Sequence, residues 1–237
     1  VTADAVRSDH FGGKESITPS FDRLCREGRR FMGAYSSIAA SGPSHAGLVS
    51  GTGPWDPGFS LHDGELPGAR TTMAEQFRLA GYRTGAFVSS DALGGRGGLS
   101  RGFDIYDDDL SWLQGWPNSL FGRLERRLAD ARQESRLGER TVDQALEWLQ
   151  QETGGPFFAW VHMSDPLPPY APPPPWDAEH YIGDPRDPAH LSMKEARDAA
   201  PLPAYLEGIT DAEWPRAQYR GEIAYSDAQL GRLLDWL

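Results

Sequence analysis

Two short apolar runs restrict this chain to an α/β fold more strongly than any other feature. Residues 84–89 and 157–161 each suit a buried strand, because they are short, largely apolar and bounded by polar or turn-forming residues. Residues 1–4 read as the end of a third strand. Helical patterns lie between these strands, and this alternation predicts a mostly parallel sheet that is covered on both faces.

Several of the helices have recognisable starts. Thr18 followed by Pro19 begins one that stops near Gly28, and Thr72 with Glu75 forms a capping box for a helix that runs to residue 80. Further predicted elements are a helix that follows Ser44, one or two helices over 119–150, a last helix from about Tyr219, and a loop over 93–118.

The domain organisation is predicted to be simple. The chain has 237 residues, which fits a single α/β domain. A proline-rich segment over 166–215 is expected to be extended loop with short helical pieces inside that domain. Both ends look truncated, since residues 1–4 lack the beginning of a strand and a helical stripe reaches Leu237 without a cap. We therefore expect one incomplete domain over residues 1–237.

Composition excludes some partners. The 23 Lys and Arg against 34 Asp and Glu give a formal net charge of -11, so no general attraction to nucleic acid is expected. No apolar run is long enough to span a bilayer. The single cysteine, Cys25, shares a predicted helix face with Phe21 and Leu24 and is interpreted as a small buried hydrophobe. The sequence assigns neither an oligomeric state nor a compartment.

Residues 41–46, Ser-Gly-Pro-Ser-His-Ala, place a hydroxyl immediately ahead of a predicted helix. Free N–H groups and the positive end of the helix dipole stabilise an oxyanion, a sulfate or a phosphate at such a point. Ser41 is therefore a candidate nucleophile. Ligands of parallel sheets bind beyond the carboxyl ends of the strands, so Asp4, Ser41, Ser89 and Asp165 are expected near one sheet edge.

An ordered set of short stretches matches one known family. They are residues 4–12, 18–24 with 27–28, 34–37, 41–51, 81–90, 101–104, 160–162 with 165–166, and 221–227. In this order and spacing they resemble the sulfatase family of the alkaline phosphatase superfamily. The resemblance covers nearly the whole chain apart from the proline-rich segment.

The resemblance implies an alkaline-phosphatase-like three-layer α/β/α sandwich with one or two divalent metal ions at the strand ends. It further implies that Ser41 attacks a sulfate or phosphate ester and that Asp4 and Ser41 are metal ligands. The ion would lower the pKa of the nucleophile and neutralise the oxyanion, and Ca²⁺, Mg²⁺, Mn²⁺ or Zn²⁺ are the candidates. The implied substrate is a small anionic ester, carried on a glycan or a lipid, and export or membrane association is compatible with the resemblance.

Three positions depart from the family pattern. His45 stands where the signature of formylglycine-forming sulfatases has Arg, which favours an unmodified Ser41. Ala5 follows Asp4 where many relatives have a second Asp. Leu167 replaces a His that contacts the anionic group of the substrate, and a leucine cannot donate a hydrogen bond to an oxyanion. We therefore predict that His45 and His162 bind the substrate.

Three functions follow from these observations. The leading hypothesis is a metal-dependent hydrolase of sulfate esters. The first alternative, favoured by the unmodified Ser41, is a phosphodiesterase or a transferase that moves a phosphoryl or phospho-headgroup. The second alternative, favoured by Ala5, Leu167 and the absence of Arg at position 45, is a sulfatase-like domain that binds an anionic ligand without catalysis. The Asp–His metal ligands that the family places after the last helix lie outside residues 1–237, so little activity is expected of these residues alone.

Overall fold

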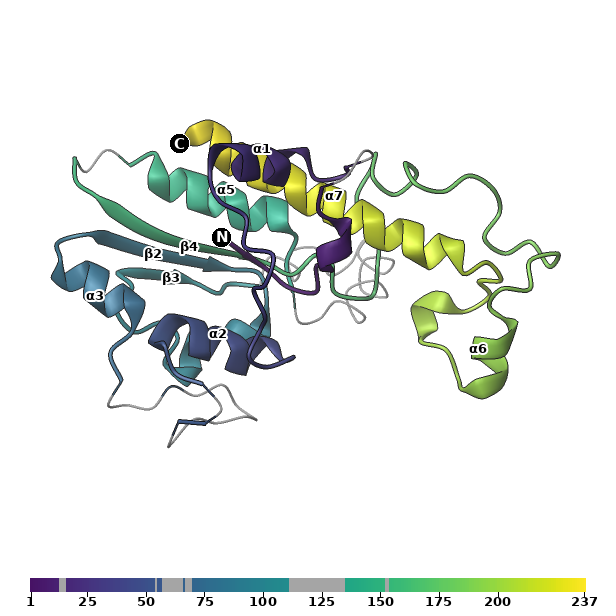
Figure 1. Ribbon diagram of the computed structural model, residues 1–237, viewed down its shortest axis with the longest axis horizontal. Coiled ribbons are helices and arrows are strands. Elements are labelled where there is room, and N and C mark those ends of the chain that lie inside the picture. Colours follow the sequence, from purple (N-terminus) through teal and green to yellow (C-terminus); the bar gives the residue numbers. More distant parts are fainter. Residues whose placement is uncertain (13–15, 54, 57–65, 67–69, 111–134, 152–153) are drawn as a thin grey trace, which may run out of the picture.

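In the described part of the chain, the sheet contains four parallel strands in the order β1-β4-β2-β3 (Figure 1). The computed structural model describes residues 1–12, 16–53, 55–56, 66, 70–110, 135–151 and 154–237. The strands are β1 (Thr2–Ala3), β2 (Arg83–Val88), β3 (Ile105–Asp107) and β4 (Phe157–Met163). Strand β1 pairs with β4 so that Thr2 lies opposite His162, which joins the start of the chain to a strand 160 residues later.

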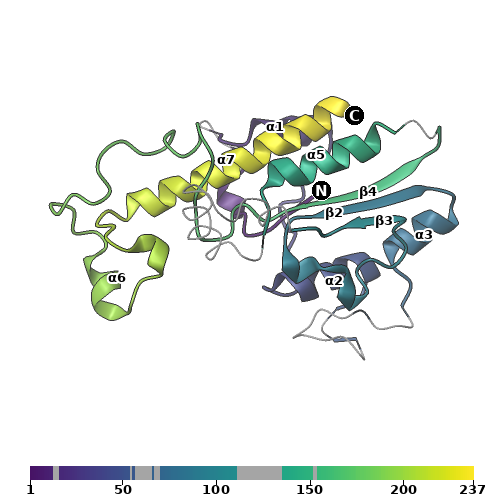
Figure 2. The ribbon, with the colours of Figure 1, turned by 180° about the vertical axis from the view of Figure 1, so that it is seen from behind.

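Helices cover both faces of the sheet and complete a three-layer α/β/α sandwich (Figures 1 and 2). One face carries α5 (Gly138–Leu149), with α7 (Glu213–Trp236) packed on α5 and α1 (Pro19–Glu27) packed on α7. The other face carries α2 (Ser41–Ser50) and α3 (Met73–Leu79). The short helices are η1 (Ser8–His10), η2 (Asp91–Leu93), η3 (Gly95–Gly97), α6 (Lys194–Ala199) and η5 (Ala204–Leu206).

Strand β4 divides its side chains between two cores, because successive residues of a strand point to opposite faces. Val161 and Met163 pack with Val142 of α5 in the core on one face. Trp160 packs with Ala46 of α2 in the core on the other. His162, two residues beyond Trp160, therefore points toward the α2 side of the sheet.

Two helices begin earlier than the sequence predicts. Helix α2 starts at Ser41 rather than after Ser44, and α7 starts at Glu213 rather than near Tyr219. Pro43 and Pro215 lie in the first turns, where the missing N–H of proline has no intrahelical partner to lose. The capping box at Thr72 is confirmed, since its side chain accepts from the Glu75 amide and the Glu75 carboxylate accepts from the Thr72 amide.

Two other predictions are wrong. The expected loop over 93–118 contains strand β3, a three-residue edge strand that pairs only with β2 among the described strands and is too short to show an apolar run. Cys25 is half-buried rather than buried, because α1 lies on the outer side of α7 and has no fully buried residue. Residues 111–134, including much of the predicted helix over 119–150, lie outside the described residues.

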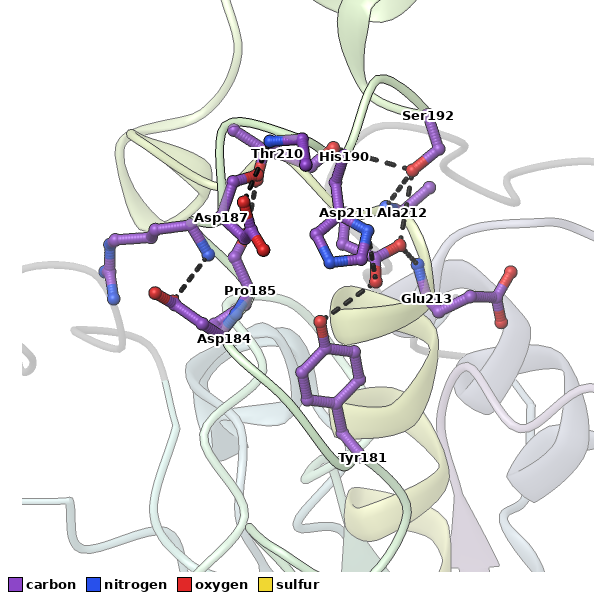
Figure 3. A network of polar contacts seen from close by, with 12 residues as sticks. Tyr181, Asp184, Pro185, Asp187, His190, Ser192, Thr210, Asp211, Ala212 and Glu213 are labelled. Carbon is purple, nitrogen blue, oxygen red and sulfur yellow. Dashed lines mark hydrogen bonds and ion pairs between the residues drawn. The ribbon is translucent and has the colours of Figure 1, made fainter.

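Much of the proline-rich segment is held together by the carboxylate of Asp211 (Figure 3). This carboxylate accepts hydrogen bonds from the Tyr181 hydroxyl (2.9 Å), the Ser192 hydroxyl (3.2 Å) and the Glu213 amide (3.0 Å), and it faces the His190 ring at 3.5 Å. The Glu213 bond caps the first turn of α7. The segment is thus anchored to the start of α7, with α6 lying away from the sheet (Figure 1). Within the described residues, no helix has the length and apolar character needed to cross a membrane.

Candidate active site

Asp4 and Ser41 are in direct contact at the carboxyl end of the sheet. The backbone amide of Asp4 donates to the Met163 carbonyl (3.0 Å), which continues the pairing of β1 with β4 by one residue. Ser41 is the first residue of α2, and its hydroxyl donates a hydrogen bond to the Asp4 carboxylate. The candidate nucleophile and the candidate metal ligand therefore meet where the positive end of the α2 dipole faces the strand ends.

The turn after Asp4 is held from the far side by Tyr219 of α7. The Tyr219 hydroxyl donates to the Ala5 carbonyl (2.6 Å) and accepts from the Arg7 amide (2.9 Å). Ala5 has a φ of 57°, in the left-handed region that residues other than glycine seldom adopt. The two hydrogen bonds support this conformation and keep the Asp4 side chain at the sheet edge.

His45 lies one turn after Ser41 on α2 and is buried. Its Nδ1 is 2.8 Å from the Ser41 carbonyl oxygen. A carbonyl only accepts, so the neutral ring carries its proton on Nδ1 and its Nε2 has a free lone pair. The ring stacks on Trp160 at a centroid distance of 5.7 Å and meets the His162 ring edge-on at 4.8 Å.

His162 is fully buried at the end of β4. Its Nδ1 lies 3.0 Å from the Thr2 hydroxyl oxygen, which also accepts a 2.9 Å hydrogen bond from the Trp160 indole. Its Nε2 lies 3.7 Å from the Asp4 carboxylate and has no hydrogen-bond partner among the described residues. Burial lowers the pKa of the His162 imidazole to about 3, with a further contribution from His45, so the ring is neutral near pH 7.

These side chains converge on one point. Asp4, His45 and His162 each offer a ligand atom, and the three atoms lie within 4.8 Å of one another. Imidazole nitrogens and carboxylate oxygens are donors that divalent transition ions accept, and the buried Nε2 of His162 lacks a hydrogen-bond partner within the described residues. The residues present therefore fit a bound metal ion.

Two other residues expected at this edge serve different groups. The Ser89 hydroxyl contacts the Ser164 hydroxyl at 2.9 Å. The Asp165 carboxylate accepts a 2.8 Å hydrogen bond from the Gly138 amide and so caps the start of α5. We find neither in contact with Asp4 or Ser41 in the part of the chain that the structure describes.

Sequence reasoning missed three residues that shape the site: Thr2, Trp160 and Tyr219. The first two could have been found from the sequence, because residues two apart in a strand share a face of the sheet. Thr2 is two residues before Asp4, and Trp160 is two residues before His162. Tyr219 lies on α7, far from Asp4 in sequence, and no local pattern connects the two.

A family model and two curated proteins are similar to this chain. The family model described as Sulfatase matches residues 1–237. An N-acetylgalactosamine-6-O-sulfatase of Bacteroides thetaiotaomicron is 39% identical over 80 residues, which cover 32% of this chain and 16% of that protein. The multifunctional alkaline phosphatase superfamily protein PehA of Trinickia caryophylli is 24% identical over 280 residues, which cover 93% of this chain and 54% of PehA.

Solved structures of phosphonate monoester hydrolases share the fold. That of Agrobacterium radiobacter aligns with a TM-score of 0.62 at 20% identity, covering 99% of this chain and 57% of the other. That of Silicibacter pomeroyi aligns with a TM-score of 0.63 at 18% identity, covering 100% and 58%. The chain thus spans about half the length of PehA and of these two hydrolases.

Proposed function

The chain belongs to the sulfatase family, and on this premise we propose that it contributes the nucleophile of a metal-dependent enzyme that hydrolyses sulfate esters. Ester hydrolysis in general is supported by the family and by its sulfatase relatives. The observation that carries the more specific proposal is the hydrogen bond from the Ser41 hydroxyl to the Asp4 carboxylate at the start of α2.

Ser41 is proposed to attack the sulfur or phosphorus of the ester. Its oxygen forms the new bond as the bond to the ester oxygen breaks, and the hydroxyl proton passes to the Asp4 carboxylate, which already accepts its hydrogen bond. The departing alcohol oxygen takes a proton from water, and a second water then hydrolyses the ester formed on Ser41. The N-terminal amides of α2 favour the negative charge that develops on the transferred group. A divalent ion held by Asp4 and Ser41 would supply Lewis-acid polarisation of the ester.

His45 and His162 are proposed to form the substrate side of the site. Both rings are buried next to Ser41 and Asp4, which suits groups that act on the anionic part of a substrate. The relatives named for N-acetylgalactosamine-6-O-sulfate and N-acetylglucosamine-6-O-sulfate chemistry favour a glycan as the alcohol part. The chain covers only a small part of each of these relatives, so their substrates suggest a class and no specific sugar.

Phosphoester chemistry is the second candidate function. His45 occupies the position at which the formylglycine signature has Arg, and this favours a Ser41 that keeps its hydroxyl. A phosphodiesterase or a phosphoryl transferase would use that hydroxyl directly. Residues 1–237 alone are expected to turn over little of either ester.

The test is an assay of the full-length protein with a chromogenic sulfate ester and a chromogenic phosphodiester, each with Mn²⁺, Ca²⁺ or Zn²⁺. Mass spectrometry of the peptide that contains Ser41 separates the two chemistries: formylglycine supports the sulfatase route and a trapped phosphoserine supports the phosphoryl route. Absence of turnover with both esters, while metal is measurably bound, would reject catalysis and leave a domain that only binds an anionic ligand.

A further inference from the structure

We propose that His45 and His162 are ligands of the metal ion together with Asp4, and that this site takes a zinc-class ion in preference to Ca²⁺ or Mg²⁺. The inference deepens the proposed function and rests on it for the location of the site. In this arrangement the two histidines act on the substrate through the ion rather than by direct hydrogen bonds.

Both rings are held in the way that metal-binding histidines are commonly held. The Nδ1 of His45 donates to the Ser41 carbonyl at 2.8 Å, and the Nδ1 of His162 lies 3.0 Å from the Thr2 hydroxyl. Thr2 can accept from His162 while it also accepts from Trp160, because a hydroxyl oxygen has two lone pairs. In that tautomer both rings present an unprotonated Nε2, with orientation set by the bond at Nδ1.

The second observation is the unpartnered Nε2 of His162. The residue is fully buried, and this nitrogen has no hydrogen-bond partner among the described residues although it faces the Asp4 carboxylate at 3.7 Å. Buried polar atoms without a partner are rare in folded proteins, and a missing ion is one accepted reason for them. A metal ion between His162 and Asp4 would satisfy both groups.

The donor atoms select the class of ion. Zn²⁺ binds imidazole nitrogen and carboxylate oxygen, commonly with four ligands, whereas Ca²⁺ takes six to eight oxygen ligands and Mg²⁺ demands an octahedron of oxygens. The three donor atoms lie within 4.8 Å of one another. Donors around one tetrahedral zinc ion lie about 3.4 Å apart, so a small closure of these side chains would bring the three donors to coordinating distance, and the Ser41 hydroxyl is adjacent as a further oxygen ligand.

This arrangement also accounts for the histidine at position 45. A histidine that binds a divalent ion brings a positive charge to the place where the formylglycine signature has the guanidinium of an arginine. The neutral Nε2 of His45 can bind that ion, whereas a guanidinium is always protonated and cannot act as a ligand. A histidine in place of arginine at this position therefore supplies a metal ligand as well as, through the bound ion, the positive charge.

The test measures metal binding without substrate. Metal-free full-length protein is titrated with Zn²⁺, Ca²⁺ and Co²⁺, the last being followed by its visible absorption. We expect zinc to bind more tightly than calcium, and H45Q and H162Q each to weaken zinc binding by at least about tenfold. The matched control is H190Q, since His190 lies in the proline-rich segment against Asp211, and it should bind zinc like the wild type.

Nitrogen-15 spectra of the histidine rings provide a measurement that needs no variant, in case H162Q does not fold. Zinc should shift the Nε2 resonances of two of the six histidines of this chain, and H45Q should remove one of the two shifts. Unchanged zinc affinity in both variants, unshifted ring signals, or calcium binding tighter than zinc would overturn the inference. If the full-length protein still hydrolysed an ester in that case, the proposed function would stand and only the metal-ligand proposal would fall. If zinc binding depended on the two histidines but no ester were hydrolysed, only the proposed function would be rejected.

Discussion

The hydroxyl of Tyr219 donates a 2.6 Å hydrogen bond to the carbonyl of Ala5 and thereby ties helix α7 to the turn that follows Asp4. The same hydroxyl accepts from the Arg7 amide, so one side chain fixes two points of the turn. The position of the Asp4 carboxylate at the sheet edge therefore depends on a side chain of helix α7.

Replacement of Tyr219 by Phe removes both hydrogen bonds and keeps the ring. We expect the free energy of unfolding in urea to fall by about 1–2 kcal/mol, since each bond contributes about 1 kcal/mol. Y205F is the matched control, because the Tyr205 hydroxyl has no hydrogen-bond partner among the described residues. Equal effects of the two variants would contradict the role of the Tyr219 hydroxyl.

Replacement of Ala5 by Gly should stabilise the protein. The φ of 57° is strained for alanine and ordinary for glycine, and the relief exceeds the entropy that glycine adds to the unfolded chain, with a net gain of roughly 0.5 kcal/mol. Ala3, in the extended conformation of β1, supplies the control: A3G should lower the unfolding free energy. The prediction requires that A5G raise and A3G lower the free energy of unfolding in urea, and changes of the same sign would contradict it.

Replacement of Asp227 by Ala should destabilise α1, although Asp227 belongs to α7. Its carboxylate accepts 2.8 Å hydrogen bonds from the amides of Ser20 and Phe21, whereas Thr18 at the N-cap position makes no side-chain capping bond. Loss of such a cap costs about 1–2 kcal/mol. D235A, which removes an exposed ion pair with Arg23, should cost less than about 0.5 kcal/mol in the same urea titration.

Replacement of Thr2 by Val preserves the shape of the side chain but removes the oxygen shared by Trp160 and His162. We expect a loss of about 1–3 kcal/mol in unfolding free energy, because two buried polar groups lose their partner. Zinc affinity should fall as well, since the ring of His162 is no longer oriented. T2S keeps the hydroxyl and should restore zinc binding; a failure of this rescue would argue against an orienting role for Thr2.

Replacement of Ser41 by Ala should lower turnover of the better ester by at least about a thousandfold, as expected when a nucleophile is removed. Circular dichroism and the urea midpoint verify that the variant is folded. Ser44 lies on the same helix, and its hydroxyl contacts that of Ser36 at 2.9 Å. S44A should therefore retain most of the activity, and comparable losses in both variants would show that the assay reports on helix α2 rather than on the Ser41 oxygen.

Elements with a local signature could be predicted from the sequence. Strands β2 and β4 contain short, largely apolar runs, and α3 carries its capping box within its first turn. Strand β3 has only three residues and depends on pairing with β2, so no periodic pattern marks it. The predicted starts of α2 and α7 fall later than the observed ones, because proline is compatible both with a first helical turn and with the segment that precedes a helix.

The sequence predicts those site residues that lie at the ends of strands or at the start of the neighbouring helix. Asp4 and His162 end neighbouring parallel strands, and Ser41 begins a helix that packs beside them, so all three share an edge. The tautomer of His45 and the isolated Nε2 of His162 depend on contacts with Ser41 and Thr2 that only the folded chain forms.

The cap of α1 has a consequence for biosynthesis. The backbone amide of Phe21 donates to the Asp227 carboxylate, which lies 206 residues further along the chain. The ribosome must therefore synthesise α7 as far as Asp227 before the start of α1 can be capped. Until then the amides of Ser20 and Phe21 lack this partner, and premature termination upstream of residue 227 would leave an uncapped helix start that chaperones and proteases can recognise.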